Sequence, residues 1–232
     1  MFDPIAEQYD AWYDTPKGQA LFATELECLR PLVEHMGEAR LEIGVGTGRF
    51  AEALGISHGV DPAPKPLELA ASRGINTSCA AGEQLPYADG KFDGVLIAFT
   101  LCFVNDPEQV LREVNRVLRA NGELVLGIIP RGSPLGDEYT RRGQEGHPIY
   151  SAASFLSIPK TEELLAACGF QVLDHRSTLF ASPQEDQDPV DPSTPMESRD
   201  GVVPGAGFVA FYAKKQQLVA ADATELCDHH SR

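Results

Sequence analysis

Three glycines and one carboxylate stand at spacings that favour ligand binding. Gly44, Gly46 and Gly48 follow an apolar stretch and precede an amphipathic one, so they fall where the chain turns tightly from a strand into a helix. The missing side chains leave room for a ligand against the main chain. Asp61 ends the next apolar run, and a carboxylate at a second strand end can accept hydrogen bonds from ribose hydroxyls. We therefore expect a nucleoside-containing cofactor.

The glycine spacing separates two classes of cofactor. Dinucleotide-binding enzymes favour Gly-x-Gly-x-x-Gly, in which the helix N-terminus receives a pyrophosphate. This chain instead has Gly-x-Gly-x-Gly from Gly44 to Gly48. Asp61 suits either class, so an NAD(P)-dependent oxidoreductase remains an alternative. A second interpretation of Asp61 is an ordinary turn carboxylate beside Pro62.

The elements that must position these residues alternate between short apolar runs and amphipathic segments. This alternation is typical of βαβ units around a parallel sheet. Their order predicts a doubly wound sheet that an antiparallel hairpin closes. The expected strands are 40–44, 57–61, 75–79, 93–99, 123–129, 170–173 and 207–213.

Two of the expected helices have clear end signals. The first spans 107–119, because Asp106 can cap its N-terminus. The second spans 161–168, with Thr161 as its cap and Gly169 as its stop. The first helix is expected to pack on the sheet through its apolar face, and the second leads into the strand that begins at Phe170.

The chain divides into three expected regions. Residues 1–39 should form a helical lid, because leucines recur at helical spacing with Pro31 as an interruption. The main domain should cover 40–215. Within it, the stretch 183–205 holds five prolines and many acidic residues, which predicts an acidic loop between two strands. Residues 216–232 should be a flexible tail.

Charge and composition exclude several classes of partner. The chain has 34 acidic and 19 basic residues, for a formal net charge of −15. This field repels phosphate backbones and anionic membrane surfaces, so we expect no nucleic-acid partner. No run approaches the roughly 18 apolar residues of a membrane-spanning helix, so no membrane insertion is expected.

The cysteines indicate reduced thiols in a cytoplasmic protein. They are odd in number and scattered, and none has a histidine nearby at ligand spacing. His229 and His230 form a tandem pair that lacks further ligands, so no metal site is expected. The cysteines are Cys28, Cys79, Cys102, Cys168 and Cys227.

Four segments in order carry a resemblance to a known family. LEIGVGTGRF at 41–50 resembles the first motif of the class I S-adenosylmethionine-dependent methyltransferases. GVDP at 59–62 resembles the end of the family's second strand. The segment 83–93 resembles its LPF…FD motif, and 111–122 resembles L…E..RVL+PGG. The pattern is similar to the small-molecule branch (methyltransferase type 11) that includes ubiquinone and menaquinone methyltransferases.

The resemblance implies a fold and an activity. The fold is an α/β Rossmann-like, seven-stranded, mostly parallel sheet with helices on both faces and an antiparallel last strand. The activity is methyl transfer from S-adenosyl-L-methionine to a small-molecule acceptor, with S-adenosyl-L-homocysteine as product, in a monomer or homodimer. A non-catalytic S-adenosylmethionine-binding regulatory protein is a further alternative.

The resemblance also implies which residues hold the cofactor. The backbone from Gly44 to Thr47 would hold the methionine part, Asp61 the ribose and Pro62 one face of the adenine, with Glu42 in support behind the methionine end. Ala81 replaces an acidic residue that relatives often carry, so backbone groups or Glu83 would hold the adenine amine. The implied cofactor-binding residues are Glu42, Gly44, Val45, Gly46, Thr47, Asp61, Pro62, Gly82, Glu83, Ala98 and Phe99.

Five residues are candidates for the acceptor side. Tyr9 and Tyr13 could shield a sulfonium cation with their rings, although core packing of a helix is a nearly equal alternative. Cys102 follows the fourth strand, where a small buried hydrophobe is the simpler interpretation. Arg131 and His147 follow the fifth strand, a region that contacts substrates in relatives. The catalytic residue stays unknown, with His147 and Tyr13 as candidates for a base.

Overall fold

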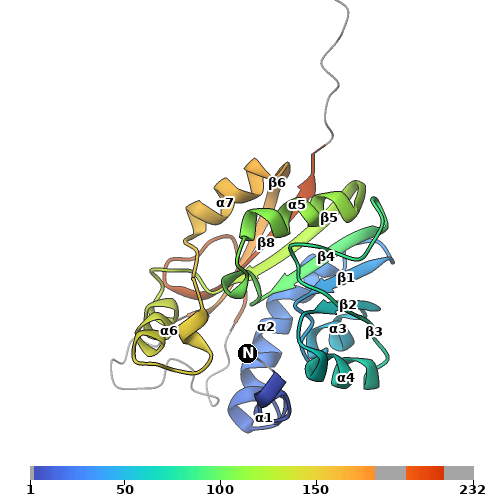
Figure 1. Cartoon of the computed structure of the whole chain (residues 1–232). Helices are drawn as coiled ribbons and strands as arrows, with labels where there is room; N and C mark the ends of the chain where they lie inside the picture. Colours follow the sequence, from blue (N-terminus) through green and yellow to red (C-terminus); the bar gives the residue numbers. More distant parts are fainter. Residues whose placement is uncertain (1–2, 181–196, 217–232) are drawn as a thin grey trace, which may run out of the picture.

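The computed structural model describes residues 3–180 and 197–216 of the 232-residue chain. A single twisted sheet lies at its centre, with strand order β3-β2-β1-β4-β5-β8-β6-β7 (Figure 1). β1 to β5 are parallel to one another, whereas β8 runs antiparallel to both β5 and β6. The strands are β1 Arg40–Ile43, β2 His58–Asp61, β3 Asn76–Cys79, β4 Phe92–Ala98, β5 Leu118–Ile128, β6 Phe170–Phe180, β7 Arg199–Asp200 and β8 Ala206–Lys215.

Helices cover both faces of this sheet. α5 and α7 pack on one face, and α2, α3, α4 and α6 contribute buried side chains to the other. Within residues 3–180 and 197–216, none of the helices combines the length and apolar content that a membrane span needs. The helices are η1 Asp3–Ile5, α1 Ala6–Trp12, α2 Pro16–Val33, α3 Arg49–Leu54, α4 Pro64–Ser72, η2 Leu101–Phe103, α5 Pro107–Val117, α6 Pro134–Gln144, η3 Tyr150–Ala152 and α7 Ile158–Ala167.

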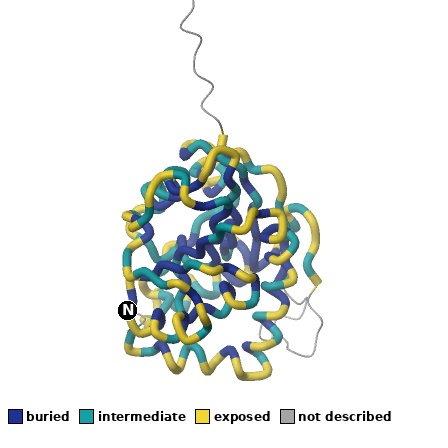
Figure 2. Tube along the Cα trace, turned by 90° about the vertical axis from the view of Figure 1, so that its right-hand side faces the viewer, coloured by how far each residue is buried: buried dark blue, intermediate teal, exposed yellow. Residues whose placement is uncertain are grey.

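The central strand β4 explains why the sheet needs two helical layers. Its side chains alternate between faces, because successive residues of a strand point to opposite sides. Val95 and Ile97 join the core beneath α5 and α7, whereas Leu96 and Ala98 join the core beneath α2 and α3. A strand that is apolar on both faces has to be covered on both. Figure 2 shows the buried residues in the middle of the molecule and the exposed ones around them.

The structure confirms the expected Rossmann-like α/β fold, with one addition. The sheet has eight strands, because β7 pairs with the edge of β6 through Arg176 with Asp200 and Ser177 with Arg199. β7 falls inside the stretch 183–205, which was expected to be a loop throughout. Residues 181–196 of that stretch and the expected tail at 217–232 lie outside the described residues.

Helix ends differ from the sequence-based expectations in two places. α5 ends at Val117, because the next two residues already belong to β5. α7 begins at Ile158, where the Ser157 hydroxyl accepts a hydrogen bond from the Lys160 N–H at 3.4 Å. Thr161 is therefore not the cap, and its hydroxyl donates to the Ser157 carbonyl at 3.0 Å from inside the helix.

α2 shows why Pro31 does not interrupt the N-terminal region. The helix continues through Pro31 to Val33. Proline lacks the N–H that would donate to the carbonyl of Glu27, but Glu27 is exposed and water can take the place of that donor. α2 is a core helix, since Cys28 and Leu29 are fully buried against the sheet. The lid that residues 1–39 were expected to form stays a prediction.

Candidate cofactor and acceptor site

The loop between β1 and α3 has a backbone that only glycine adopts readily. Gly44, Gly46 and Gly48 have φ values of +70°, +51° and +85°, in the left-handed region that side chains disfavour. At Gly44 an added Cβ would lie only 2.1 Å from Oγ1 of Thr100. At Gly46 an added Cβ would meet no atom within 4 Å. Gly46 therefore presents bare backbone to open space.

Asp61 holds this loop from the end of the neighbouring strand. Its Oδ2 accepts a hydrogen bond from the Gly46 N–H at 3.1 Å, and its Oδ1 accepts one from the Ala63 N–H at 2.8 Å. Burial raises the pKa of Asp61, and the two N–H donors offset part of that rise. Each carboxylate oxygen still has a free lone pair, so Asp61 can accept from ribose hydroxyls while it holds the loop.

Glu42 lies behind the glycine loop with an unsatisfied oxygen. Its neighbours Leu41 and Ile43 pack under α5 and α7, so Glu42 points to the opposite face, where the Ala51 N–H of α3 donates to it. The side chain is 2% exposed, and among the described residues its Oε2 has no hydrogen-bond partner. Burial raises the pKa of Glu42 well above its usual value, and nearby Asp61 adds to the rise.

A buried orphan oxygen is costly unless a further group completes it. The ammonium group of an amino acid would complete Glu42, and the nucleoside of the same molecule would lie against Gly46 and Asp61. The residues present therefore fit S-adenosylmethionine, which carries both parts.

Other predicted cofactor residues have structural partners of their own. Glu83 Oε1 accepts from the N–H groups of Asn105 at 3.0 Å and Asp106 at 3.4 Å, so Glu83 fastens the turn before α5. Gly82 packs tightly, because an added Cβ would lie 3.1 Å from Cγ2 of Ile43. Pro62 is exposed next to Asp61. Contacts of Pro62, Gly82 and Glu83 with the cofactor stay predictions.

The end of β4 has an unusual backbone. Phe99 has a φ of +58°, which is rare for a residue with a large side chain and is often found at functional sites. Its ring stacks on Phe208 with centroids 4.7 Å apart, and its N–H donates to the Gly127 carbonyl at 3.1 Å. Ala98 precedes it and is buried. Both residues lie at the carboxyl edge of the sheet, as the glycine loop does.

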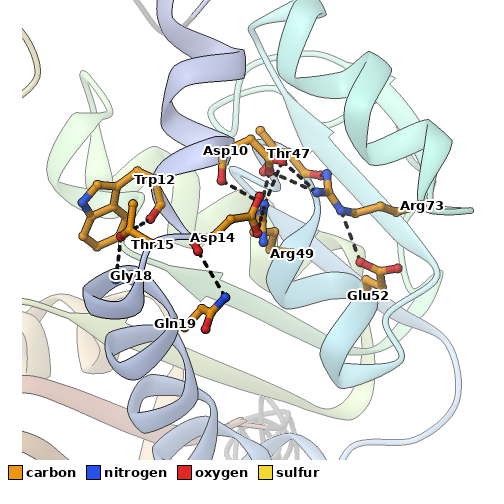
Figure 3. A network of polar contacts seen from close by, with 10 residues as sticks. All are labelled: Asp10, Trp12, Asp14, Thr15, Gly18, Gln19, Thr47, Arg49, Glu52 and Arg73. Carbon is orange, nitrogen blue, oxygen red and sulfur yellow. Dashed lines mark hydrogen bonds and ion pairs between the residues drawn. The ribbon is translucent and has the colours of Figure 1, made fainter. Parts of the chain in front are cut away.

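A network that sequence reasoning missed ties α1 to the glycine loop. Asp10 accepts hydrogen bonds from Arg49 Nε at 2.8 Å and from Arg73 Nη2 at 2.9 Å (Figure 3). Arg73 Nη1 also donates to the Thr47 carbonyl at 2.6 Å. Burial raises the pKa of Asp10, but hydrogen bonds from Arg49, Thr47 and Arg73 outweigh it and lower that pKa to about 2. α1 is thus fastened over the glycine loop by charge-assisted hydrogen bonds.

Three of the predicted acceptor residues come together near this network. The hydroxyls of Tyr9 and Tyr13 are 3.1 Å apart, and the guanidinium carbon of Arg49 lies 5.4 Å from the centroid of the Tyr13 ring. Cys102 Sγ donates to the Phe99 carbonyl at 3.4 Å, and the thiol lies close enough to Tyr9 that its ionised form would raise the pKa of the Tyr9 hydroxyl. The tyrosines therefore lie beside the carboxyl end of β4.

The other two predicted acceptor residues, His147 and Arg131, have different surroundings: His147 lies in an aromatic stack and Arg131 is exposed. His147 stacks on Tyr150 with centroids 4.5 Å apart, and Tyr150 stacks on Tyr139 at 4.1 Å. Arg131 is exposed, and its backbone N–H donates to the Leu156 carbonyl at 2.9 Å. Nothing in the described part of the chain joins the Arg131 side chain to these rings. Sequence reasoning missed Glu25 of α2, a buried carboxyl for which no local motif gave a signal.

Comparison with known proteins agrees with this geometry. A family model described as "Methyltransferase domain" matches residues 41–126. An uncharacterized protein of Mycobacterium tuberculosis is 45% identical over 211 residues, which cover 91% of this chain and 72% of the relative. A demethylmenaquinone methyltransferase of Thermotoga maritima is 32% identical over 139 residues, which cover 54% of this chain and 58% of that enzyme.

A solved structure matches over nearly the whole chain. It is described as a SAM-dependent methyltransferase and possible histamine N-methyltransferase from Thermotoga maritima. It has 32% sequence identity and a TM-score of 0.82, and the match covers 93% of this chain and 98% of that one. The chain belongs to the class I S-adenosylmethionine-dependent methyltransferases. It is an enzyme with S-adenosylmethionine as cofactor, so the oxidoreductase and the non-catalytic alternatives are set aside.

We predict that Gly46→Ala weakens cofactor binding while the protein still folds. A left-handed alanine costs about 1–2 kcal/mol, and the new methyl group enters the space that the ligand needs. Isothermal titration with S-adenosylhomocysteine measures the affinity, which should fall at least about tenfold, the equivalent of about 1.4 kcal/mol.

Gly55→Ala is the matched control for Gly46→Ala. Gly55 has a φ of +67° and also has no atom within 4 Å of an added Cβ, but it lies at the other end of α3. Its variant should lose similar stability and keep its affinity. Equal affinity losses in both variants would show that backbone strain, and not ligand space, governs binding.

We predict that Asp10→Asn loosens α1 and lowers stability by about 1 kcal/mol at neutral pH, after allowance for solvent screening. The pKa of Asp10 is lowered from 3.8 to about 2, so its contribution is complete above the unfolded value and is lost as pH falls through the folded value. The difference between wild type and variant should therefore shrink between about pH 4 and about pH 2. Urea unfolding across this range measures it.

Asp14→Asn provides the control for Asp10→Asn. Asp14 also pairs with Arg49, at 3.0 Å, but its side chain is 66% exposed. Exposed pairs contribute about 0–1 kcal/mol, so this variant should change stability less. A larger effect for Asp14→Asn than for Asp10→Asn would contradict the role assigned to Asp10.

Proposed function

We propose that the methyl acceptor is a small molecule and that the enzyme works in the cytoplasm. The observation that carries the proposal is the aromatic enclosure beside the end of β4. Tyr13 is 7% exposed there, and the rings of Tyr139 and Tyr150 stack with only 13° between their planes. A largely buried aromatic surface suits a small organic molecule better than a nucleic acid, which requires exposed cations.

The cofactor, when bound, supplies an electrophilic methyl group on a sulfonium. In this proposal, the backbone from Gly44 to Thr47 and the Glu42 carboxyl hold the amino-acid end, and Asp61 accepts from the ribose hydroxyls. Pro62 contacts one face of the adenine. The remaining work of the chain is to align the acceptor and exclude water, and alignment of this kind is worth about 7–11 kcal/mol.

The charge of the chain and its cysteines support the rest of the proposal. The formal net charge of −15 disfavours a nucleic-acid partner. Cys28, Cys79, Cys102 and Cys168 are free thiols, as expected in a reducing compartment. We propose a monomer or homodimer that acts on one small molecule at a time.

The names of the relatives suggest two kinds of acceptor to test first. The structural neighbour from Thermotoga maritima is described as a possible histamine N-methyltransferase, and another relative as a demethylmenaquinone methyltransferase. The first name points to a nitrogen acceptor and the second to a quinone precursor. Both are small molecules.

Labelled cofactor provides the direct test of the acceptor class. The enzyme is incubated with a cell extract and with cofactor that carries an isotope-labelled methyl group. The label should appear in the low-molecular-mass fraction and be absent after the enzyme is heat-inactivated. Label mainly in protein or nucleic acid would overturn the proposal.

We predict that Asp61→Asn and Glu42→Gln weaken binding of different parts of the cofactor. Asp61→Asn should reduce affinity for S-adenosylhomocysteine and for 5′-methylthioadenosine by about 1–3 kcal/mol, because both contain the ribose. Glu42→Gln should reduce affinity for S-adenosylhomocysteine alone, since 5′-methylthioadenosine lacks the amino-acid end. Isothermal titration measures each pair. If Asp61→Asn leaves 5′-methylthioadenosine binding intact, the ribose lies elsewhere.

A further inference from the structure

α2 carries a buried carboxyl group, that of Glu25, which has no role in the cofactor site or in the proposed function. Glu25 is 8% exposed, although it lies on a helix whose other charged residues mostly face solvent. One turn before it on α2, Phe22 contacts the Tyr13 ring with centroids 5.5 Å apart, and Tyr139 packs against the core that contains Leu21 and Leu29 of the same helix. The ionised form of Glu25 would raise the pKa of Tyr9, Tyr13, Tyr139 and Tyr150, so these four phenols lie within electrostatic reach of its carboxyl. Glu25 and these four tyrosines, the Glu25 cluster, come from α1 and its C-terminal end, α2, α6 and η3.

Glu25 has no charge partner in the part of the chain that the structure describes. No hydrogen bond or ion pair reaches its carboxyl among residues 3–180 and 197–216, and burial alone raises its pKa to about 8. The nearest cations of the cluster are already paired. Arg49, at the Tyr13 ring, bonds to Asp10, and Arg142, at the Tyr139 ring, bonds to Glu138 at 2.7 Å.

A buried carboxyl without a partner is costly, and proteins seldom keep one without a use. The surroundings of Glu25 are suited to a cation. Hydroxyls of Tyr9 and Tyr13 can accept N–H donors, and the rings of Tyr139 and Tyr150 present faces that attract positive charge. A carboxylate among aromatic faces in a water-poor setting binds an ammonium group by a charge-assisted hydrogen bond.

The Glu25 cluster lies on the side of the sheet where an acceptor must approach. Cys102, four residues beyond the end of β4, lies close enough to Tyr9 and Tyr150 that its ionised form would raise the pKa of both hydroxyls. Its carbonyl accepts the Ser154 N–H at 2.7 Å, which fastens the segment after η3 to the end of β4. On the other side, Tyr13 contacts Arg49 directly after the glycine loop. The cluster and the cofactor loop therefore share one edge.

We propose that the methyl acceptor carries a basic nitrogen and that Glu25, with the tyrosines of its cluster, binds that nitrogen as an ammonium group. This inference rests on the proposed small-molecule acceptor and adds its chemical class, an amine. A neutral acceptor such as a quinone precursor would leave the Glu25 carboxyl without a partner.

Amine binding should release a proton from the Glu25 carboxyl, because burial raises its pKa to about 8 and the bound ammonium ion favours its ionised form. No other group of the cluster titrates near neutral pH. Burial raises the pKa of Tyr9 to about 12 and the pKa of Tyr13, Tyr139 and Tyr150 above the usual value. Burial also raises the pKa of the neighbouring Cys28 and Cys102 thiols to about 12. The free protein thus holds Glu25 mostly protonated at neutral pH, and an ammonium ion stabilises its ionised form.

The ionisation of Glu25 sets how amine affinity depends on pH. Amine affinity should rise by about tenfold or more between about pH 6 and about pH 8, since the carboxyl no longer has to be ionised at the higher pH while the amine stays protonated. His147 is the imidazole that stacks on Tyr150 of the cluster. His147→Gln separates the two groups, because the rise should persist in that variant.

The experiment compares amines with matched alcohols. Isothermal titration to the protein loaded with S-adenosylhomocysteine uses phenethylamine, butylamine and an imidazole-bearing amine, each paired with the alcohol of the same skeleton. At least one amine should bind about tenfold or more tightly than its alcohol. Titration in two buffers of different ionisation heat measures the released proton, which alcohol binding should not produce.

Two variants on α2 test the residue. Glu25→Gln keeps the shape of the neutral side chain, so it should fold and should lose about tenfold or more in amine affinity and the proton release. Glu27→Gln makes the same change at an exposed position of the same helix and should stay within about twofold of wild type. Thermal unfolding verifies that each variant is folded. If Glu25→Gln does not fold, the inference is tested on the wild type alone, by its preference for amines over alcohols and by the proton that amine binding releases.

Each outcome separates this inference from the proposed function. Amine binding that survives Glu25→Gln, or alcohols that bind as well as amines, would overturn the inference and leave the small-molecule acceptor intact. If no amine binds while S-adenosylhomocysteine binds normally, the inference is likewise overturned and the small-molecule acceptor stays intact. Methyl label in macromolecules would overturn the proposed function itself.

Discussion

The hydrogen bond from the Gly46 N–H to the Asp61 carboxylate is the contact on which the cofactor side depends. It joins the ends of β1 and β2, which pair in parallel and therefore end at one edge of the sheet. The bond requires a left-handed backbone at Gly46, and that backbone requires glycine. A single interaction thus places the bare main chain beside the carboxylate for which we propose the ribose contact, which a free loop would not do.

Charge is distributed unevenly around this contact. The chain is strongly acidic as a whole, yet Arg49 and Arg73 are concentrated at the glycine loop, where Asp10 engages both. Glu42 and Glu25 lie deeper and lack cations among the described residues. The structure therefore distinguishes two kinds of carboxylate: those that neutralise arginines to fix the loop, and buried ones whose partners are expected to come from ligands.

Segments far apart in the sequence build the acceptor side. Tyr9 and Tyr13 come from the N-terminal helices, whereas Tyr139 and Tyr150 come from the insertion between β5 and β6. In the proposed function, the sheet supplies cofactor chemistry that is common to many acceptors, and these added helices supply the surface that chooses among them. This division matches the general rule that a fold carries the scaffold while specific residues on it carry specificity.

The sequence by itself determined the family, the cofactor and most of the sheet, because a glycine turn, a strand-end carboxylate and alternating apolar runs are local patterns. Sequence reasoning missed β7, because the pairing of an edge strand depends on neighbours in space. It also placed the start of α7 three residues late, at 161 and not at Ile158, because more than one residue could serve as the cap. Only the tertiary structure brought Asp10 to Arg73 and Glu25 to Tyr139. Such contacts join residues with no fixed spacing, and each forms only after distant helices have packed on the same sheet.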